Sequence, residues 1–145
     1  MNMAVAFEEK TITFPSEIEN INIIERWVDD ICDEYKVGEE NYGNILIALT
    51  EAVSNAISHG NRRDPSKEVN FTFKPSKDEL VFIVEDEGPG FDYNNLPDPT
   101  APENIEMPNG RGVFLMQNLA DEVEFNETGS VVELRFKHSV PSELV

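Results

Sequence analysis

Residues 46–61, LIALTEAVSNAISHGN, carry the pattern that decides the fold of this chain. Apolar side chains recur there at intervals of three and four, which is typical of an amphipathic helix. The apolar positions are Ile45, Leu49, Ala52, Val53, Ala56 and Ile57. At about 100° per residue, Glu51 and Asn55 lie one turn apart on a stripe roughly opposite this apolar arc. A carboxylate and a carboxamide in this arrangement can reach one ligand, or can belong to an ordinary solvated helix face.

Three later stretches of the sequence favour ligand binding by Glu51 and Asn55 over an ordinary solvated helix face. Asp86 to Asp92, DEGPGFD, contains Gly88 and Gly90 around a proline, which predicts a tight loop where backbone can approach a ligand closely. Residues 93–109 follow with four prolines and no periodicity, as in many lids and binding segments. Gly110-Arg111-Gly112 then opens a helix, whose free amides and dipole favour a phosphate.

The remaining sequence alternates strand and helix patterns around these motifs. Ser16 and Glu19 fit a capping box at the start of the first helix. The expected elements are a strand at 10–14, helices at 16–36 and 39–60, strands at 69–73 and 80–84, a loop at 93–109, a helix at 110–119, and strands at 122–126 and 131–136. This order predicts an α+β fold, a two-layer sandwich with helices on one face of a mixed, mostly antiparallel sheet. We expect one domain over residues 1–145.

Composition excludes several classes of function. The chain has 11 basic and 29 acidic residues, and its net charge of −18 repels nucleic acid and anionic membranes. Any anionic ligand must therefore be bound locally, by backbone amides, a metal ion or the few cations nearby. Arg62 and Arg63 are expected at the surface. The single cysteine, Cys32, excludes an internal disulfide and any multi-cysteine metal site. No run approaches the ~18 apolar residues of a membrane span, so we expect a cytoplasmic protein.

Taken together, the motifs resemble those of the Bergerat-fold (GHKL) superfamily of ATPases and kinases. EAVSNAISHGN is similar to its N box, DEGPGFD to its first glycine box, and NGRGVFLM to its second. The resemblance covers roughly residues 39–136. Within the superfamily, the short length and the E-A-V-x-N-A-x-x-H-G wording are most similar to the anti-sigma factor serine/threonine kinases. The resemblance implies the Bergerat fold, with ATP and Mg²⁺ as cofactors.

The resemblance also implies a role for each motif residue. Asn55 would give one oxygen to Mg²⁺, whose other ligands are phosphate oxygens and water. Glu51 would be the catalytic residue, the base that accepts the proton of the attacking hydroxyl. Asp86 would read the adenine amino group. Arg111 stands where this branch commonly has an aliphatic residue, and either contacts a phosphate or points to solvent. The implied cofactor-binding set is Asn55, Asp86, Gly88, Gly90, Gly110, Arg111 and Gly112.

The predicted function is that of an ATP-dependent anti-sigma regulatory kinase. Such a protein binds a sigma factor and phosphorylates a small antagonist protein on serine or threonine. The resemblance implies a homodimer, and we expect no direct contact with nucleic acid or membrane. Two alternatives stay open: a non-catalytic switch that binds its partner in the ATP state, and a detached histidine kinase catalytic domain. Glu51 discriminates between transfer and pure binding, because only a hydroxyl acceptor needs a base.

Overall fold

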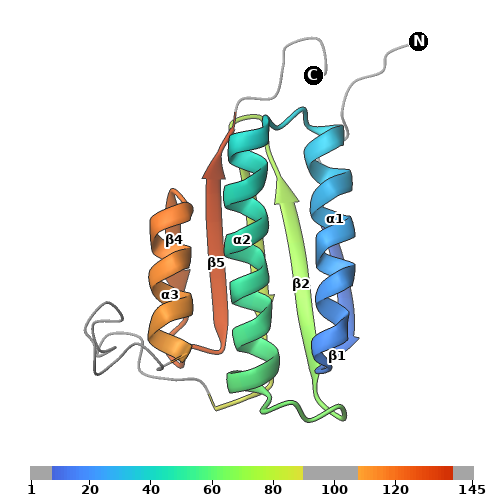
Figure 1. Cartoon of the computed structure of the whole chain (residues 1–145), viewed down its shortest axis with the longest axis vertical. Helices are drawn as coiled ribbons and strands as arrows, with labels where there is room; N and C mark the ends of the chain where they lie inside the picture. Colours follow the sequence, from blue (N-terminus) through green and yellow to red (C-terminus); the bar gives the residue numbers. More distant parts are fainter. Residues whose placement is uncertain (1–7, 90–107, 139–145) are drawn as a thin grey trace.

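Three helices lie side by side on one face of a five-stranded sheet, with α2 between α1 and α3 (Figure 1). The structure is a computed structural model that describes residues 8–89 and 108–138, with the backbone alone described at 108–111. The elements are β1 (Lys10–Pro15), η1 (Ile18–Asn20), α1 (Ile21–Glu34), α2 (Glu39–Asn55), η2 (Ala56–Gly60), β2 (Glu68–Pro75), β3 (Glu79–Glu85), α3 (Pro108–Leu119), β4 (Glu122–Phe125) and β5 (Val131–Lys137). In this described part of the chain, no helix is long and apolar enough to cross a membrane.

The sheet has the order β1-β2-β3-β5-β4, and every pairing between its described strands is antiparallel. The predicted α+β two-layer sandwich is therefore confirmed, with a sheet that is antiparallel rather than mixed over the described strands. Both predicted hairpins form, since β2 pairs with β3 and β4 with β5. The first hairpin lies in the sheet's interior, so its polar backbone groups are matched on both edges.

In the core between the two layers, α2 packs against aromatic side chains of the sheet. From the sheet, Phe73 and Phe82 stack with ring centroids 5.0 Å apart, and Phe71 is fully buried beside them. From α2, the side chains of Leu49 and Val53 are completely buried against this layer. Burying each such side chain contributes about 1.5–3 kcal/mol. The apolar stripe of α2 is thus held against the sheet, which fixes the direction in which its polar stripe points.

The helical run that begins at Glu39 ends at Gly60, as predicted, but its last five residues form a π-helical turn. In this turn the Asn61 amide reaches back five residues, to the Ala56 carbonyl at 2.8 Å. A π-turn inserts one extra residue into the helical register, and such turns are frequent at functional sites. The wider turn brings Gly60 and Asn61 against the loop that follows β3.

The predicted capping box at the first helix is wrong. Glu17, not Ser16, precedes the short helical turn η1, and no side chain caps it. Ser16 is only 1% exposed, and its hydroxyl donates a hydrogen bond to the Lys67 carbonyl at 2.7 Å. A buried hydroxyl requires a partner in the protein interior, and the β1–β2 end of the sheet supplies one that local sequence does not reveal.

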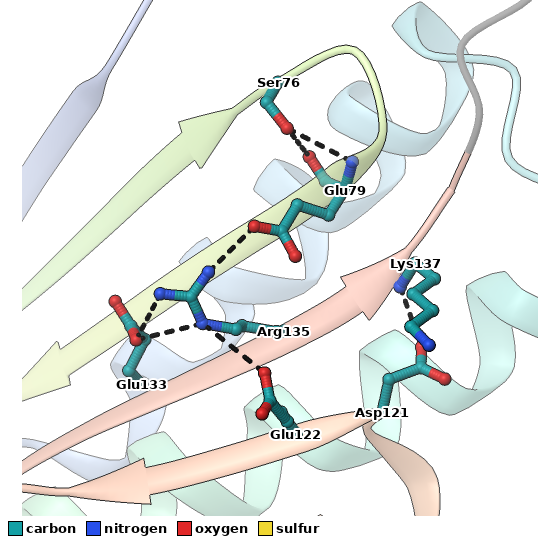
Figure 2. A network of polar contacts seen from close by, with 7 residues as sticks. All are labelled: Ser76, Glu79, Asp121, Glu122, Glu133, Arg135 and Lys137. Carbon is teal, nitrogen blue, oxygen red and sulfur yellow. Dashed lines mark hydrogen bonds and ion pairs between the residues drawn. The ribbon is translucent and has the colours of Figure 1, made fainter.

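The other face of the sheet carries charged side chains, and none of the helices in the described part of the chain covers it (Figures 1 and 2). On it, the Arg135 guanidinium donates hydrogen bonds to Glu79 at 2.8 Å and to Glu133 at 2.9 Å, and Glu122 lies 3.9 Å away. Figure 2 shows these carboxylates reaching Arg135 from strands β3, β4 and β5. This Arg135 network joins three strands on the side of the sheet away from α2.

Candidate functional site

A cavity of about 200 Å³ lies at the C-terminal end of α2. Its apolar wall is formed by Ala52, Ala56, Val84, Met116, Phe125 and Val132. Its polar groups are Asn55, His59, Arg62, Asp86 and Ser130. These residues come from α2, from η2 and the turn after it, from β3 and the loop after it, from α3, and from the β4–β5 hairpin. Asn55 and Asp86, predicted from separate motifs, therefore line the same cavity.

Asp86 is the one carboxylate among the described residues that line this cavity. Its backbone amide donates to the Ser130 carbonyl at 3.0 Å, and the Gly88 amide donates to its Oδ1 at 2.8 Å. Burial raises the pKa of Asp86, and the Gly88 hydrogen bond partly opposes this shift. The site thus holds a partly desolvated carboxylate with a second oxygen able to accept a hydrogen bond from a ligand.

Two glycines allow the loop after β3 to lie directly on the π-turn. A Cβ on Gly60 would be 2.3 Å from the Asp86 carboxyl carbon, and a Cβ on Gly88 would be 2.0 Å from the Gly60 carbonyl oxygen. Neither distance is compatible with a side chain. Gly88 was predicted to permit close approach of a ligand, whereas the group that lies against it is the backbone of Gly60. Gly90 lies outside the described residues.

Helix α3 lines the cavity with Met116 and lies against Asn55 at Gly112. A Cβ at Gly112 would be 2.5 Å from Asn55 Nδ2, so the bare backbone of α3 lies against the Asn55 side chain. The helix begins at Pro108, two residues before the predicted start, and Gly110 and Arg111 lie in its first turn. The side chain of Arg111 is outside the described part, and its contact with a phosphate stays a prediction.

Glu51 lies one turn before Asn55 on α2 and is partly exposed. The described residues that line the cavity do not include it. A base for phosphoryl transfer acts at the γ-phosphate, at the opposite end of a nucleotide from the purine ring. A position on α2 outside a ring-sized cavity is compatible with this role, which stays a prediction.

The residues present fit a nucleotide carried with its metal better than a free metal ion. A volume of about 200 Å³ is below the roughly 300–1,000 Å³ of pockets that enclose a whole drug-sized ligand, so the cavity suits a flat ring. Within residues 8–89 and 108–138, no group of three or more His, Cys, Asp or Glu side chains could hold a metal ion. Asn55 could supply one neutral oxygen to Mg²⁺, which retains waters and takes phosphate oxygens.

Several residues of the site were not predicted. The β4–β5 hairpin supplies Phe125, Ser130 and Val132, and α3 supplies Met116. Alternation in the strands indicates which side chains face the helices, but it does not indicate which end of the sheet holds a cavity. Arg62 was expected at the surface, and it is exposed while also lining the cavity rim. Most of the predicted lid, residues 93–109, lies outside the described residues.

Helices on one face of an antiparallel sheet, with three motifs meeting at the end of the central helix, are features of the histidine kinase-like ATPases. Residues 14–136 match the histidine kinase-like ATPase domain, and the chain belongs to this family.

Relatives named serine-protein kinase RsbW extend over most of the chain. One from Bacillus cereus is 26% identical over 142 residues, which cover 94% of this chain and 88% of the relative. One from Oceanobacillus iheyensis is 24% identical over 136 residues, covering 90% of this chain and 86% of the relative. A crystal structure of the RsbU and RsbW domains of a Mycobacterium tuberculosis protein matches 95% of this chain with a TM-score of 0.63 and 15% identity. This chain spans 34% of that one, and the likeness shows the shared fold.

Proposed function

We propose that this chain is an ATP- and Mg²⁺-dependent protein serine/threonine kinase of the anti-sigma type. The observation that carries the proposal is the convergence of three motifs at one cavity: Asn55 lies against Gly112, and Asp86 lies against Gly60. The relatives' name, serine-protein kinase, supports the same reading. The net charge of the chain, −18, opposes binding of a triphosphate. In this proposal the backbone amides in the first turn of α3 and the metal ion bind the triphosphate locally.

In this proposal each end of the site has a separate task. Asp86 accepts a hydrogen bond from the adenine amino group within the apolar cavity, and Asn55 supplies an oxygen to the metal beside α3. Glu51, one turn earlier on α2, takes the proton of the acceptor hydroxyl. The hydroxyl oxygen then bonds to the γ-phosphorus while the bond from that phosphorus to ADP breaks and ADP leaves. Phosphoryl transfer depends mainly on positioning and charge stabilisation, so one base and one metal suffice.

The test is transfer of labelled phosphate from ATP, with Mg²⁺, to a candidate antagonist protein encoded nearby. Wild-type protein should label a serine or threonine of the antagonist. Glu51→Gln should slow this transfer by ~10²–10⁴-fold while ATP still binds, because the variant keeps the shape of the side chain and loses the base. Glu40→Gln, an exposed glutamate in the first turn of the same helix, is the matched control and should transfer at the wild-type rate.

A second candidate is a non-catalytic switch that binds its partner in the ATP state. It is favoured by one observation: Glu51 is absent from the described residues that line the cavity. A switch would bind ATP in wild-type and Glu51→Gln protein alike and would label no antagonist. Acid-labile phosphate on a histidine of another protein would instead favour a detached histidine kinase catalytic domain.

The proposed partners are a sigma factor and its small antagonist, bound by a cytoplasmic homodimer. The acidic surface is suited to basic segments of a protein partner and unsuited to nucleic acid. Sedimentation of the purified chain with and without Mg·ATP would measure the oligomeric state. Co-purification with sigma factors from the same genome would identify the sigma partner, and transfer of phosphate would identify the antagonist.

A further inference from the structure

We propose that Asn61 is a positioning residue that holds the Asp86 loop in place and thereby contributes to selectivity for adenine. This inference rests on the proposed function, because it concerns how the nucleotide site reads its base. Asn61 is outside the cavity, and it acts through its hydrogen bonds rather than by touching a ligand. Its side chain lies at the junction of the π-turn, the start of β2 and the loop after β3.

The side chain of Asn61 joins three parts of the chain. Its Nδ2 donates to the Ser16 hydroxyl oxygen at 2.7 Å and to the Glu68 carbonyl at 3.0 Å. Its Oδ1 accepts a hydrogen bond from the Glu87 backbone amide at 2.7 Å. Ser16 in turn donates to the Lys67 carbonyl at 2.7 Å. This Asn61 network therefore links the end of β1, the start of β2 and the residue that directly follows Asp86.

The chemistry of the partners specifies an asparagine. The Glu87 amide can only donate and the Glu68 carbonyl can only accept, so the position needs an acceptor and a donor on one short planar group. Asn61 and Ser16 are each 1% exposed, so water cannot replace a lost bond easily. Aspartate would place an acceptor oxygen opposite the Glu68 carbonyl oxygen, which is itself an acceptor. Alanine would remove the side-chain partner of the Glu87 amide and of the Glu68 carbonyl.

The effect on Asp86 follows from three successive backbone amides. The Asp86 amide is held by the Ser130 carbonyl, the Glu87 amide by Asn61, and the Gly88 amide by the Asp86 carboxylate itself. Asn61 supplies the middle contact, and it directly follows the helical run that contains Asn55 and Gly60. The exposed carboxylate of Glu87 also accepts a bond from the Glu68 amide, but water can compete with this contact. Asn61 is thus the buried connection between the base-reading loop and α2.

The first arm of the test uses nucleotide-free protein, so it does not depend on the proposed function. Amide hydrogen exchange is measured for Gly88 and for the core of β3 in wild type, Asn61→Ala and Asn70→Ala. Asn61→Ala should speed exchange at Gly88 by about tenfold or more while the β3 core keeps its protection. Asn70 also hydrogen-bonds to neighbours, Thr13 and Glu85, but on the open sheet face, so its variant should leave Gly88 unchanged.

The second arm measures the ratio of ATP to GTP affinity by calorimetry. Asn61→Ala should reduce the preference for ATP from at least about tenfold to within about threefold. Ser16→Ala removes the two hydrogen bonds of the Ser16 hydroxyl, to Asn61 and to the Lys67 carbonyl. It leaves the contact between Asn61 and Glu87, so it should lower the melting temperature and keep the preference for ATP. If Asn61→Ala does not fold, Asn61→Ser gives the same comparison, because its shorter side chain stays polar without spanning to Glu87.

The outcomes separate the two proposals. Unchanged protection at Gly88 in Asn61→Ala would overturn the anchoring, and so would a loss that the β3 core shares, since that indicates a structural role alone. Faster exchange at Gly88 with an unchanged nucleotide ratio would overturn the link to selectivity. Wild-type protein that binds neither nucleotide would overturn the proposed function and the selectivity with it, while the exchange arm would still decide whether Asn61 holds the loop.

Discussion

Two polar networks in this molecule differ in how far solvent reaches them: one is partly exposed and the other is buried. The Arg135 network on the open face of the sheet joins full charges, and its arginine side chain is 31% exposed (Figure 2). The Asn61 network beneath the cavity consists of one carboxamide, one hydroxyl and backbone groups, and its two side chains are 1% exposed. The Arg135 network has the stronger charges. In the Asn61 network, water cannot easily take the place of a lost hydrogen-bond partner.

The difference teaches that charge is a poor guide to which contacts matter here. Exposed ion pairs gain little because water and salt screen them, and water solvates whichever partner remains after a substitution. Each group left unmatched in a buried network costs about 1–3 kcal/mol, because no water takes the place of the lost partner. We therefore expect small substitutions beside the cavity to lower stability and ATP affinity strongly. We expect even the loss of a charge on the open sheet face to lower stability only weakly.

Gly60→Ala should have the largest effect. The new methyl group would lie 2.3 Å from the Asp86 carboxyl carbon, so the π-turn and the loop must separate. Overpacking of this kind costs about 1–3 kcal/mol of stability, and displacement of Asp86 should reduce ATP affinity by about a hundredfold. Denaturant unfolding and calorimetry measure the two quantities.

Gly43→Ala is the control for that substitution. Gly43 lies within α2 and has no atom within 4 Å of the position that a Cβ would occupy. Alanine there should stabilise the helix by about 0.5–1 kcal/mol and leave ATP affinity unchanged. If both glycine variants affected ATP affinity equally, the close approach of Gly60 to Asp86 would not be a feature of the site.

Much of the fold could be predicted, because it depends on periodicity that each segment carries by itself. The three- and four-residue apolar spacing around Leu49 predicted α2, and alternation around Phe71 predicted the interior hairpin. The resemblance of the motifs to those of the Bergerat fold also implied that Asn55 and Asp86 belong to one site, and both line one cavity. Their roles toward a nucleotide stay predictions.

The contacts that were missed come from segments far apart in the sequence. Ser16 followed by Glu19 has the local pattern of a cap, and only the position of the Lys67 carbonyl decides otherwise. The π-turn has the same apolar spacing as an α-helix at Ala56 and Ile57, so its extra residue leaves no mark in the pattern. Asn61 begins a polar stretch, residues 61–67, that is typical of a turn. This local pattern does not indicate that its partners lie in three different parts of the chain.

Asp86→Asn tests the ligand-facing side of the cavity and should have the next largest effect. An ionised carboxylate offers acceptors only, so it pairs with the amino group of adenine and opposes the carbonyl oxygen of guanine. Wild-type protein should therefore prefer ATP over GTP by at least about tenfold. The asparagine variant should lose ATP affinity and narrow this gap, as measured by calorimetry. Equal binding of ATP and GTP by the wild type would exclude Asp86 as the base-reading group.

A smaller effect is expected from pH. Burial raises the pKa of Asp86 in the folded protein, so the fold binds this proton more tightly than the unfolded chain does. The resulting contribution to stability is complete below the unfolded pKa and is lost as pH rises through the folded pKa. The unfolding free energy of wild type relative to Asp86→Asn should therefore fall with rising pH across the window just above the ordinary pKa of aspartate. A difference that is flat or rising there would contradict a desolvated Asp86.

Arg135→Gln should have the smallest effect, although it removes the central charge of the largest ion-pair network in Figure 2. Glu79, Glu122 and Glu133 would each face water after the substitution, and repulsion between them would be screened by salt. The melting temperature should fall by only a few degrees at low salt and by less at high salt, with no change in ATP affinity. Lys74→Gln removes an exposed cation on strand β2, which β3 separates from β5, and is the matched control for the loss of one positive charge. If Arg135→Gln alone lowered ATP affinity as much as Asp86→Asn does, the sheet would transmit charge changes from its open face to the cavity, and the contrast between the two networks would not hold.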